Sequence, residues 1–337
     1  MKSIFTFKRK DNVCELFEQY LIERAREAFW APRTNQNNKT FLEHIKRFDN
    51  TLCLSRINKE VLTRFIDYLR VTMDMEDSSV RKQFKILTSF LHWAQASGYV
   101  LPHEVTRFRP VFKIPHKPVI FLSRDELLTL YRFDIPANGT IVTLKDINGQ
   151  AYIKKVKHPH RLEIARDLFC FLALTGLRFS DMAALRRSDI VEGTLNVVTQ
   201  KTNSRIQIKL NSYALAILEK YRGKTLNSNK ALPVICNQRL NMYLKEVCEL
   251  CGFNTPIHIT LFKHGRRCDI TVPKYSKITS HCGRRTFICF MLSIGVPPQV
   301  VMKFTGHSDY DSMKPYIDIT EQTQTDAMAA MEAELQK

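Results

Sequence analysis

The first part of the chain repeats apolar residues with a period near 3.6, which is typical of amphipathic helices. The expected helices lie at residues 11–30, from Asn38 or Thr40 onward, after Asn58, and from about Ser78 to Gly98. Short loops separate them, so residues 1–105 are expected to form a small four-helix bundle. Its polar faces carry basic side chains, namely Lys39, Lys46, Arg47, Arg64, Arg81, Lys82 and Lys85. Such side chains are ordinarily just solvated, and only the motif near the C-terminus described below favours their contact with phosphate.

The pattern changes at residues 106–120, where prolines recur among basic residues. Because proline cannot continue a helix, this segment predicts a linker between two domains. Ser123 and Glu126 then have the spacing of a capping box, which marks the start of a helix. Residues 121–337 therefore predict a second domain that is also mainly helical.

Two stretches of the second domain alternate apolar and polar residues with a period of two, as β-strands do. The first surrounds Asn148-Gly149, a strong hairpin signal, and predicts a β-hairpin at residues 136–160. The second, Thr194 to Leu210, predicts another hairpin with Lys201 at its turn. The fold class that follows is mainly α with small β-hairpins.

The net charge of the chain, +18 over 337 residues, indicates what kind of partner it binds. Basic residues exceed acidic ones in both predicted domains, so the expected partner is a polyanion, most simply nucleic acid. A basic protein without a specific partner is the alternative. No apolar run reaches the roughly 18 residues of a membrane span, and the first residues do not resemble a secretory signal. Nine scattered cysteines fit a reducing cytoplasm.

Candidate chemistry is concentrated near the C-terminus. His281 and Arg284 are three residues apart, so they share one face of a predicted helix. A second predicted helix ends at Gly306, and His307 follows directly. Tyr316 comes nine residues later. A hydrophobic core requires none of these four polar side chains, and the pattern places them at helix edges where they can converge.

This pattern, H-x-x-R followed by G-H and a tyrosine, resembles the C-terminal motif of the tyrosine recombinases, the phage integrase family. Residues 175–181, T-G-L-R-F-S-D, resemble the family's first arginine motif. The bundle, the basic linker and the capped helix resemble the boundary between its two domains. The resemblance implies an N-terminal SAM-like four-helix core-binding domain at residues 1–105 and a C-terminal catalytic domain at residues 121–337.

The resemblance also implies a role for each motif residue. Tyr316 would attack a DNA phosphodiester, giving a 3′-phosphotyrosine and a free 5′-hydroxyl. Arg178 and Arg284 would hold the phosphate oxygens, and Asp181 would orient Arg178 or simply neutralise it. Because arginines supply the positive charge and the protein–DNA link keeps the bond energy, neither a metal nor another cofactor is expected.

The remaining three roles are two proton transfers and one further contact with the phosphate. Lys201 is in register with a family lysine that protonates the leaving 5′-oxygen, with Lys209 as the weaker candidate. His281 would take the tyrosine proton, and His307 would bind the phosphate. Arg205, and the hairpin residues Lys154, Lys155 and Lys157, are candidate DNA contacts. The resemblance implies that the hairpin at residues 136–160 is an insertion, because the family connects these helices more directly. This inserted hairpin could equally be a surface elaboration.

A competing motif has the spacing of a zinc finger. It consists of Cys248, Cys251, His264 and Cys268. Both of the first two cysteines also continue the apolar face of a helix that starts near Asn237, which would place them in the core. We therefore expect no metal here.

The predicted function is site-specific recombination, in which double-stranded DNA is cut and rejoined to integrate or excise a mobile element. A non-catalytic DNA-binding protein on this scaffold and a type IB-like topoisomerase are the alternatives. The complete residue set argues against the first. A predicted tail helix at residues 320–337, with Met328, Met331 and Leu335 on one face, would cap its own domain or dock on a neighbouring protomer.

Docking of the tail would suit a homo-tetramer on two DNA sites, with accessory DNA-bending proteins as further candidate partners. The segment before residue 11 is too short for the arm-binding domain of the larger integrases. This predicts a simpler recombinase or a trimmed integrase.

Overall fold

The structure is a computed structural model that describes residues 11–28, 30–115, 118–201, 203–307, 309–317 and 331–332. Within these residues the chain is mainly helical with three small β-sheets, which confirms the expected fold class. The chain divides into two compact units, residues 1–117 with 259–270 and residues 118–258 with 271–337. Among the described helices, none has the length and apolar character needed to cross a membrane. Most of the predicted tail helix lies outside the described residues.

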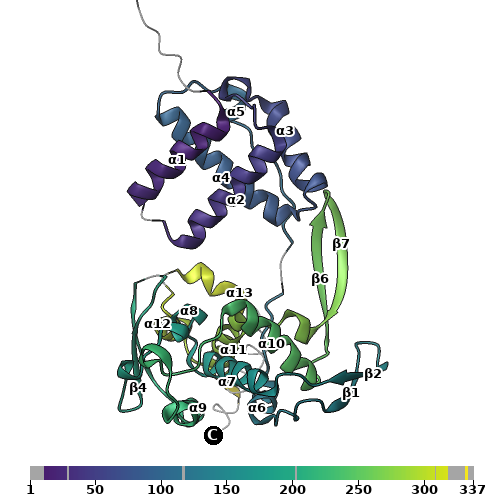
Figure 1. The fold of residues 1–337 in the computed structure, drawn as a ribbon, viewed down its shortest axis with the longest axis vertical. Helices are drawn as coiled ribbons and strands as arrows, with labels where there is room; N and C mark the ends of the chain where they lie inside the picture. Colours follow the sequence, from purple (N-terminus) through teal and green to yellow (C-terminus); the bar gives the residue numbers. More distant parts are fainter. Residues whose placement is uncertain are drawn as a thin grey trace, which may run out of the picture. The chain divides into compact units, whose positions relative to one another are not determined.

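The first unit is a helical bundle (Figure 1). Its helices are α1 (Val13–Ala28), α2 (Pro32–Asp49), α3 (Lys59–Asp67), α4 (Asp77–Ala96) and α5 (His103–Thr106), with a 3₁₀ turn at Leu54–Arg56 and a π-helical turn at Tyr68–Thr72. The buried rings of Phe17, Phe41 and Phe90 meet at its centre, with centroids 5.1 and 5.2 Å from that of Phe17. Four helices were expected, and α1 to α4 confirm them.

The start of α2 corrects the sequence-based expectation. The helix begins at Pro32, not near Asn38 or Thr40. Proline suits the first helical position because its missing N–H would be unsatisfied there anyway. The polar residues that follow Pro32 gave no apolar period, so the pattern did not reveal the first two turns.

Sequence reasoning missed a long hairpin, formed by strands β6 (Pro256–Lys263) and β7 (Arg266–Pro273) (Figure 1). Its outer part, residues 259–270, belongs to the first unit. There, Lys263 Nζ and His264 Nε2 lie 2.6 and 3.0 Å from the two carboxylate oxygens of Asp74. Glu76 also pairs with Lys263 through a β-bridge. The turn residues His264 and Gly265 both have a positive φ, as a type I′ hairpin turn requires, but His-Gly is not one of the usual sequence signals for that turn.

The second unit is organised around α7 (Pro159–Thr175), which is buried along most of its length. Packed against it are α6 (Arg124–Arg132), α9 (Ser212–Arg222), α10 (Asn237–Leu250) and α11 (Ser280–Ser293). The predicted capping box opens α6, with Ser123 and Glu126 each bonded to the other's backbone N–H. Gly283 lets α11 approach α7 closely, since a Cβ at that position would lie 2.8 Å from Leu172 Cβ.

The smaller elements of the second unit surround this core. They are β1 (Ile141–Lys145), β2 (Ala151–Lys155), α8 (Phe179–Ala184), β3 (Ile190–Val191), β4 (Thr194–Val198), β5 (Arg205–Lys209), α12 (Pro298–Thr305) and α13 (Lys314–Ile317), with 3₁₀ turns at Arg187–Asp189, Asn227–Asn229, Lys274–Lys277 and Tyr310–Ser312. Strands β4 and β5 pair antiparallel as predicted, and the short β3 extends that sheet.

Strands β1 and β2 confirm the hairpin expected around Asn148-Gly149. One of its faces is attached to α10. The hydroxyl of Tyr152 donates to Glu249 Oε1 over 2.6 Å, and Lys154 forms an ion pair with the same carboxylate. Burial and this carboxylate raise the pKa of Tyr152 above its ordinary value. Lys154 is therefore engaged within the protein, whereas Lys155 is exposed.

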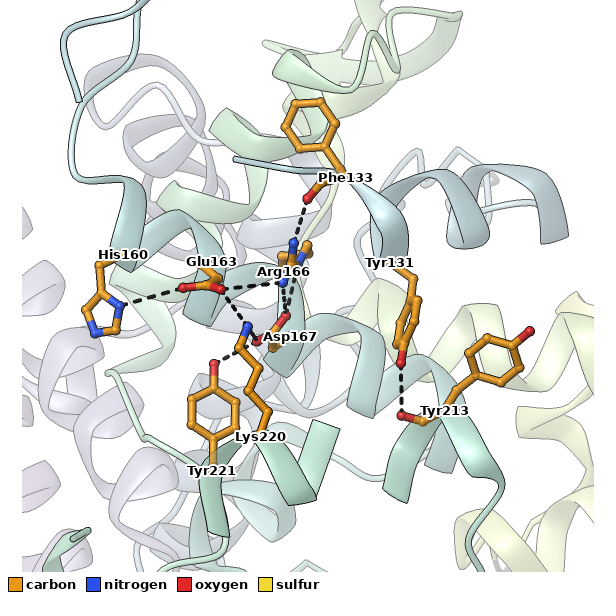
Figure 2. A network of polar contacts seen from close by, with 9 residues as sticks. All are labelled: Tyr131, Phe133, His160, Glu163, Arg166, Asp167, Tyr213, Lys220 and Tyr221. Carbon is orange, nitrogen blue, oxygen red and sulfur yellow. Dashed lines mark hydrogen bonds and ion pairs between the residues drawn. The ribbon is translucent and has the colours of Figure 1, made fainter. Parts of the chain in front are cut away.

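A second polar cluster lies near the start of α7 (Figure 2). We call it the α7 network, and it consists of Glu163, Arg166, Asp167, Lys220 and Tyr221. The nearly buried carboxylate of Asp167 accepts from Arg166 at 2.8 Å, from Lys220 at 2.5 Å and from Tyr221 at 2.7 Å. Lys220 also reaches Glu163 at 2.7 Å. The network fastens α9 to α7.

Candidate active site

Arg284 is the most buried cationic side chain of the predicted site, with 2% of its surface exposed. Its Nη1 donates to the carbonyl oxygen of Gly176 over 2.9 Å, and its Nη2 donates to that of Thr305 over 2.6 Å. The guanidinium therefore joins the loop after α7 to the end of α12. Desolvation, together with the positive charge of Arg178, lowers the pKa of Arg284 to about 9.

His307 lies beside Arg284 because Gly306 ends α12 with a positive φ of 61°. Nε2 of the imidazole is 3.0 Å from Arg284 Nη2, and Nδ1 is 2.8 Å from the hydroxyl oxygen of Thr305. Desolvation, together with the positive charges of Arg284, Arg178 and Lys201, lowers the pKa of His307 to about 4. The imidazole is therefore neutral near pH 7.

His281 occupies the first turn of α11, and its side chain is exposed at the edge of the site. Desolvation by surrounding groups lowers its pKa to about 4, and the neighbouring cations act in the same direction; they are Arg285, Arg284, Arg178 and Lys201. His281 and His307 therefore share most of their cationic neighbours, which places both histidines at one site.

Arg178 precedes α8 and is half-buried, and its Nη1 has no hydrogen-bond partner among the described residues. Asp181, 1% exposed, was expected to orient or neutralise it. Instead, Asp181 Oδ1 accepts a 2.9 Å hydrogen bond from the backbone N–H of Gln200, while Oδ2 has no partner in the described structure. The carboxylate thus fixes the turn that carries Lys201.

Lys201 is exposed in the turn between β4 and β5. Its charge acts on both His281 and His307, so this turn faces the other site residues. The alternative lysine, Lys209, donates to the backbone oxygen of Glu192 over 2.9 Å at the far end of the strand. Of the two candidates, only Lys201 is thus placed with the histidines.

Tyr316 lies on α13 and is 9% exposed. Its side chain belongs to an apolar cluster with Phe287, Val301 and Met313. A charge on the phenol oxygen would raise the pKa of Arg284, which indicates that the two side chains are neighbours. Tyr310, the other tyrosine after His307, is 45% exposed.

The structure therefore brings together the side chains singled out in the sequence, namely Arg178, Lys201, His281, Arg284, His307 and Tyr316. Sequence reasoning missed Thr305, which contacts Arg284 and His307, and Arg285, whose buried Nε has no partner in the described residues. A threonine directly before G-H and a doubled arginine were the available signals. Positive charge accumulates here with a single buried carboxylate nearby, as in a site that binds an anion.

The residues with zinc-finger spacing belong to two different units of the chain. Cys248 is buried on α10, and burial raises its pKa well above the ordinary value, which disfavours a thiolate. His264 and Cys268 lie on the β6–β7 hairpin, within the part assigned to the first unit. Within the described residues, no group of three or more His, Cys, Asp or Glu side chains could hold a metal ion.

Comparison with known proteins gives a consistent result. The phage integrase family matches residues 150–323, and the phage integrase SAM-like domain matches residues 12–109. Comparison with curated protein sequences returns no match. Among solved structures, a lambda integrase dimer bound to a COC′ core site has a TM-score of 0.66 at 17% identity, covering 91% of this chain and 95% of that chain.

Two further structures share the fold. A Tn1549 transposon integrase in complex with circular intermediate DNA has a TM-score of 0.64 at 12% identity, covering 91% of this chain and 95% of that one. A lambda integrase tetramer bound to a Holliday junction has a TM-score of 0.65 at 16% identity, covering 93% and 79%. With both of its domains matched, the chain belongs to the phage integrase family, the tyrosine recombinases.

Proposed function

We propose that this chain is a catalytically competent site-specific recombinase that cuts and rejoins double-stranded DNA through a 3′-phosphotyrosine at Tyr316. The observation that carries the proposal is the gathering of two arginines, two neutral histidines and a lysine beside a tyrosine. A DNA phosphodiester supplies the negative charge that this cluster lacks.

The charges of the site suit the transition state of such a reaction. Negative charge increases on the non-bridging phosphate oxygens as the nucleophile attacks, and preorganised donors stabilise it. Arg284 is held in place by two backbone carbonyls, and Arg178 has an unpartnered Nη1. These two guanidinium groups are the proposed phosphate ligands, and His307 is the third.

The proposed proton transfers balance in one step. The Tyr316 oxygen forms a bond to phosphorus as its proton passes to His281, which is neutral because its pKa is lowered by desolvation to about 4. The bond from phosphorus to the 5′-oxygen breaks, and Lys201 gives that oxygen a proton. A 5′-hydroxyl from a partner strand then reverses these transfers and completes strand exchange.

The biological setting belongs to the same proposal. The structural neighbours include a transposon integrase and a lambda integrase tetramer, both bound to DNA. We propose integration or excision of a mobile element by a homo-tetramer on two DNA sites in the cytoplasm. Residues 1–105 would bind DNA as the core-binding domain, residues 106–120 would link it to the catalytic domain, and the tail would join protomers.

The test requires a DNA substrate first. DNA bound to the Tyr316→Phe variant in cells is recovered and sequenced, and a nicked suicide substrate is built on the recovered site. The wild-type protein should become covalently attached to the 3′ side of the break, and Tyr310→Phe should do the same. Tyr316→Phe should bind that DNA without forming the adduct. An adduct that persists in Tyr316→Phe would falsify the proposal.

A further inference from the structure

A pocket of about 370 Å³ lies between α12 and the start of β5. We call it the α12–β5 pocket, and it is lined by residues 204–206, by one face of α12, and by Gly306 and His307. Gly306 lets the end of α12 approach the strand closely, since a Cβ at that position would lie 3.4 Å from Ile206 Cγ2. Because His307 lines the pocket and also contacts Arg284, the pocket adjoins the candidate active site.

The α12 side of the pocket follows from helical spacing. Gln299, Met302 and Lys303 are three or four positions apart, so they share one face of the helix. Val301 and Thr305 lie on the opposite face, and both are fully buried. The core therefore holds one face of α12, and the face that carries Gln299 and Lys303 is exposed at the pocket.

Strand β5 supplies a second cation. Exposed and buried residues alternate along it, so Arg205 is exposed whereas Ile206 is buried. None of the described residues that line the pocket is acidic. By contrast, the exposed Arg222 of the same unit has a carboxylate partner, because its Nη1 lies 3.3 Å from Glu219 Oε2. The pocket thus presents two positive charges without a negative one.

We propose that the α12–β5 pocket binds the phosphate next to the scissile phosphate in the cleaved DNA strand, with Arg205 and Lys303 as its ligands. This inference rests on the proposed function, in which His307 contacts the scissile phosphate. Successive phosphates of one strand are about 3.4 Å apart along the helix axis, so the ligands of one phosphate lie beside those of the next. A guanidinium and an ammonium both donate to phosphate oxygens. The exposed amide of Gln299 can donate as well.

The first test measures binding by the Tyr316→Phe protein, which requires no cleavage. Duplexes of the DNA site recovered from cells carry a single uncharged methylphosphonate, moved one phosphate at a time along each strand. At about 0.1 M salt, neutralising the phosphate held by the pocket should weaken binding roughly fivefold to tenfold, the value expected for one phosphate contact. In a protein that also carries Arg205→Gln and Lys303→Gln, the same methylphosphonate should have little further effect, because the contact is already lost.

Two outcomes of this experiment would overturn the proposal. In the first, every methylphosphonate weakens binding equally with and without the two cations. In the second, the position that depends on Arg205 and Lys303 is not adjacent to the phosphate at which the wild-type protein forms its covalent adduct.

The second test separates the pocket from positive charge in general. Each lost phosphate contact should reduce the slope of the logarithm of the binding constant against the logarithm of salt concentration by about 0.9. The Arg205→Gln, Lys303→Gln double variant should show this reduction. The matched control Arg222→Gln removes another exposed charge and should keep the wild-type slope. Lys303→Arg, which keeps the charge, should also keep it. An equal reduction in Arg222→Gln would reject a specific role for the pocket.

The pocket and the proposed function fail separately. If the wild-type protein forms no covalent adduct, the proposed function is wrong, and the methylphosphonate series still decides whether Arg205 and Lys303 hold one particular phosphate. If the adduct forms but the series is the same with and without the two cations, the proposed function stands and the phosphate site in the α12–β5 pocket is rejected.

Discussion

The two ends of α7 carry similar side chains in opposite states. In the α7 network, at the start of the helix, Arg166 and Lys220 share the carboxylate of Asp167 (Figure 2). Beyond the other end, Arg178 and Arg284 repel each other, and buried polar atoms of Arg178 and Asp181 have no partner in the described structure. A structural network satisfies its own charges, whereas a binding site leaves groups for a ligand to satisfy.

The largest expected effect is on catalysis, from a substitution at the end of α7 that carries the candidate active site. Arg178→Ala should slow covalent adduct formation by about 10²–10³, the usual loss for one preorganised donor. Affinity for DNA should fall by less than about tenfold, since other phosphate contacts remain. Urea unfolding should show little loss of stability, because an unpartnered guanidinium contributes little to the fold. Normal cleavage by this variant would remove Arg178 from the mechanism.

Lys201 offers the next test, because it is held near the site only through its turn. Lys201→Ala should cleave ordinary DNA about a hundredfold more slowly, within the range for general acid catalysis. A substrate with sulfur in place of the 5′-bridging oxygen should restore most of that rate, since its thiol leaving group needs little protonation. Arg178→Ala should not recover on the sulfur substrate. If the two variants respond alike, another residue supplies the proton.

At the opposite end of α7, Asp167→Asn should affect stability alone. Removing one partner of a buried ion pair typically costs roughly 3–5 kcal/mol; partial exposure of Lys220 reduces the expected loss here to about 2 kcal/mol. The free energy of unfolding in urea measures this loss. The cleavage rate per folded molecule should not change. Slow cleavage by a stable Asp167→Asn protein would show that the two ends of α7 are coupled.

Sequence reasoning singled out four site residues because they interrupt an apolar helical pattern, namely His281, Arg284, His307 and Tyr316. It singled out Arg178 and Lys201 because they match positions of the family's motifs. It did not locate their partners. The carboxylate of Asp181 bonds to Gln200, nineteen positions away, and Arg284 bonds to the backbone of Gly176 and Thr305. Backbone acceptors leave no trace in residue type, and long-range partners have no fixed spacing. For the same reason Arg166 and Arg178 look alike in the sequence, although only the first has its carboxylate.

The β6–β7 hairpin was missed for a different physical reason. Its strands are mostly exposed or half-buried, so burial imposed no strict alternation of apolar and polar residues. In contrast, the hairpin at Asn148-Gly149 carries a recognisable turn sequence, in which Gly149 takes a positive φ of 82°. The sequence of a turn was therefore enough to predict one hairpin. It did not predict the other hairpin, whose outer part is attached to a separate part of the chain.

The smallest expected effect is a difference between the two ends of α7 in how they make the stability of the protein depend on pH. Desolvation lowers the pKa of His307 from an ordinary 6.5 to about 4 in the folded protein. Between these values the unfolded chain binds a proton that the folded chain does not, so stability falls as pH falls through this window. Glu163 behaves differently, because a hydrogen bond from Lys220 lowers its pKa below an ordinary 4.5. Its contribution is present above pH 4.5 and is lost only below it.

Urea unfolding at pH 7, 5.5 and 4 should therefore separate the two groups. The wild type should lose stability between pH 7 and 5.5, and His307→Gln should lose less over the same interval, because glutamine has no proton to gain. Glu163→Gln should follow the wild type over that interval and differ from it only near pH 4. DNA should reduce the His307-dependent loss, since a phosphate beside the imidazole favours its protonated form. If His307→Gln and the wild type lose stability equally, His307 is not held neutral by its site, and the contrast between the two ends of α7 rests on the arginines alone.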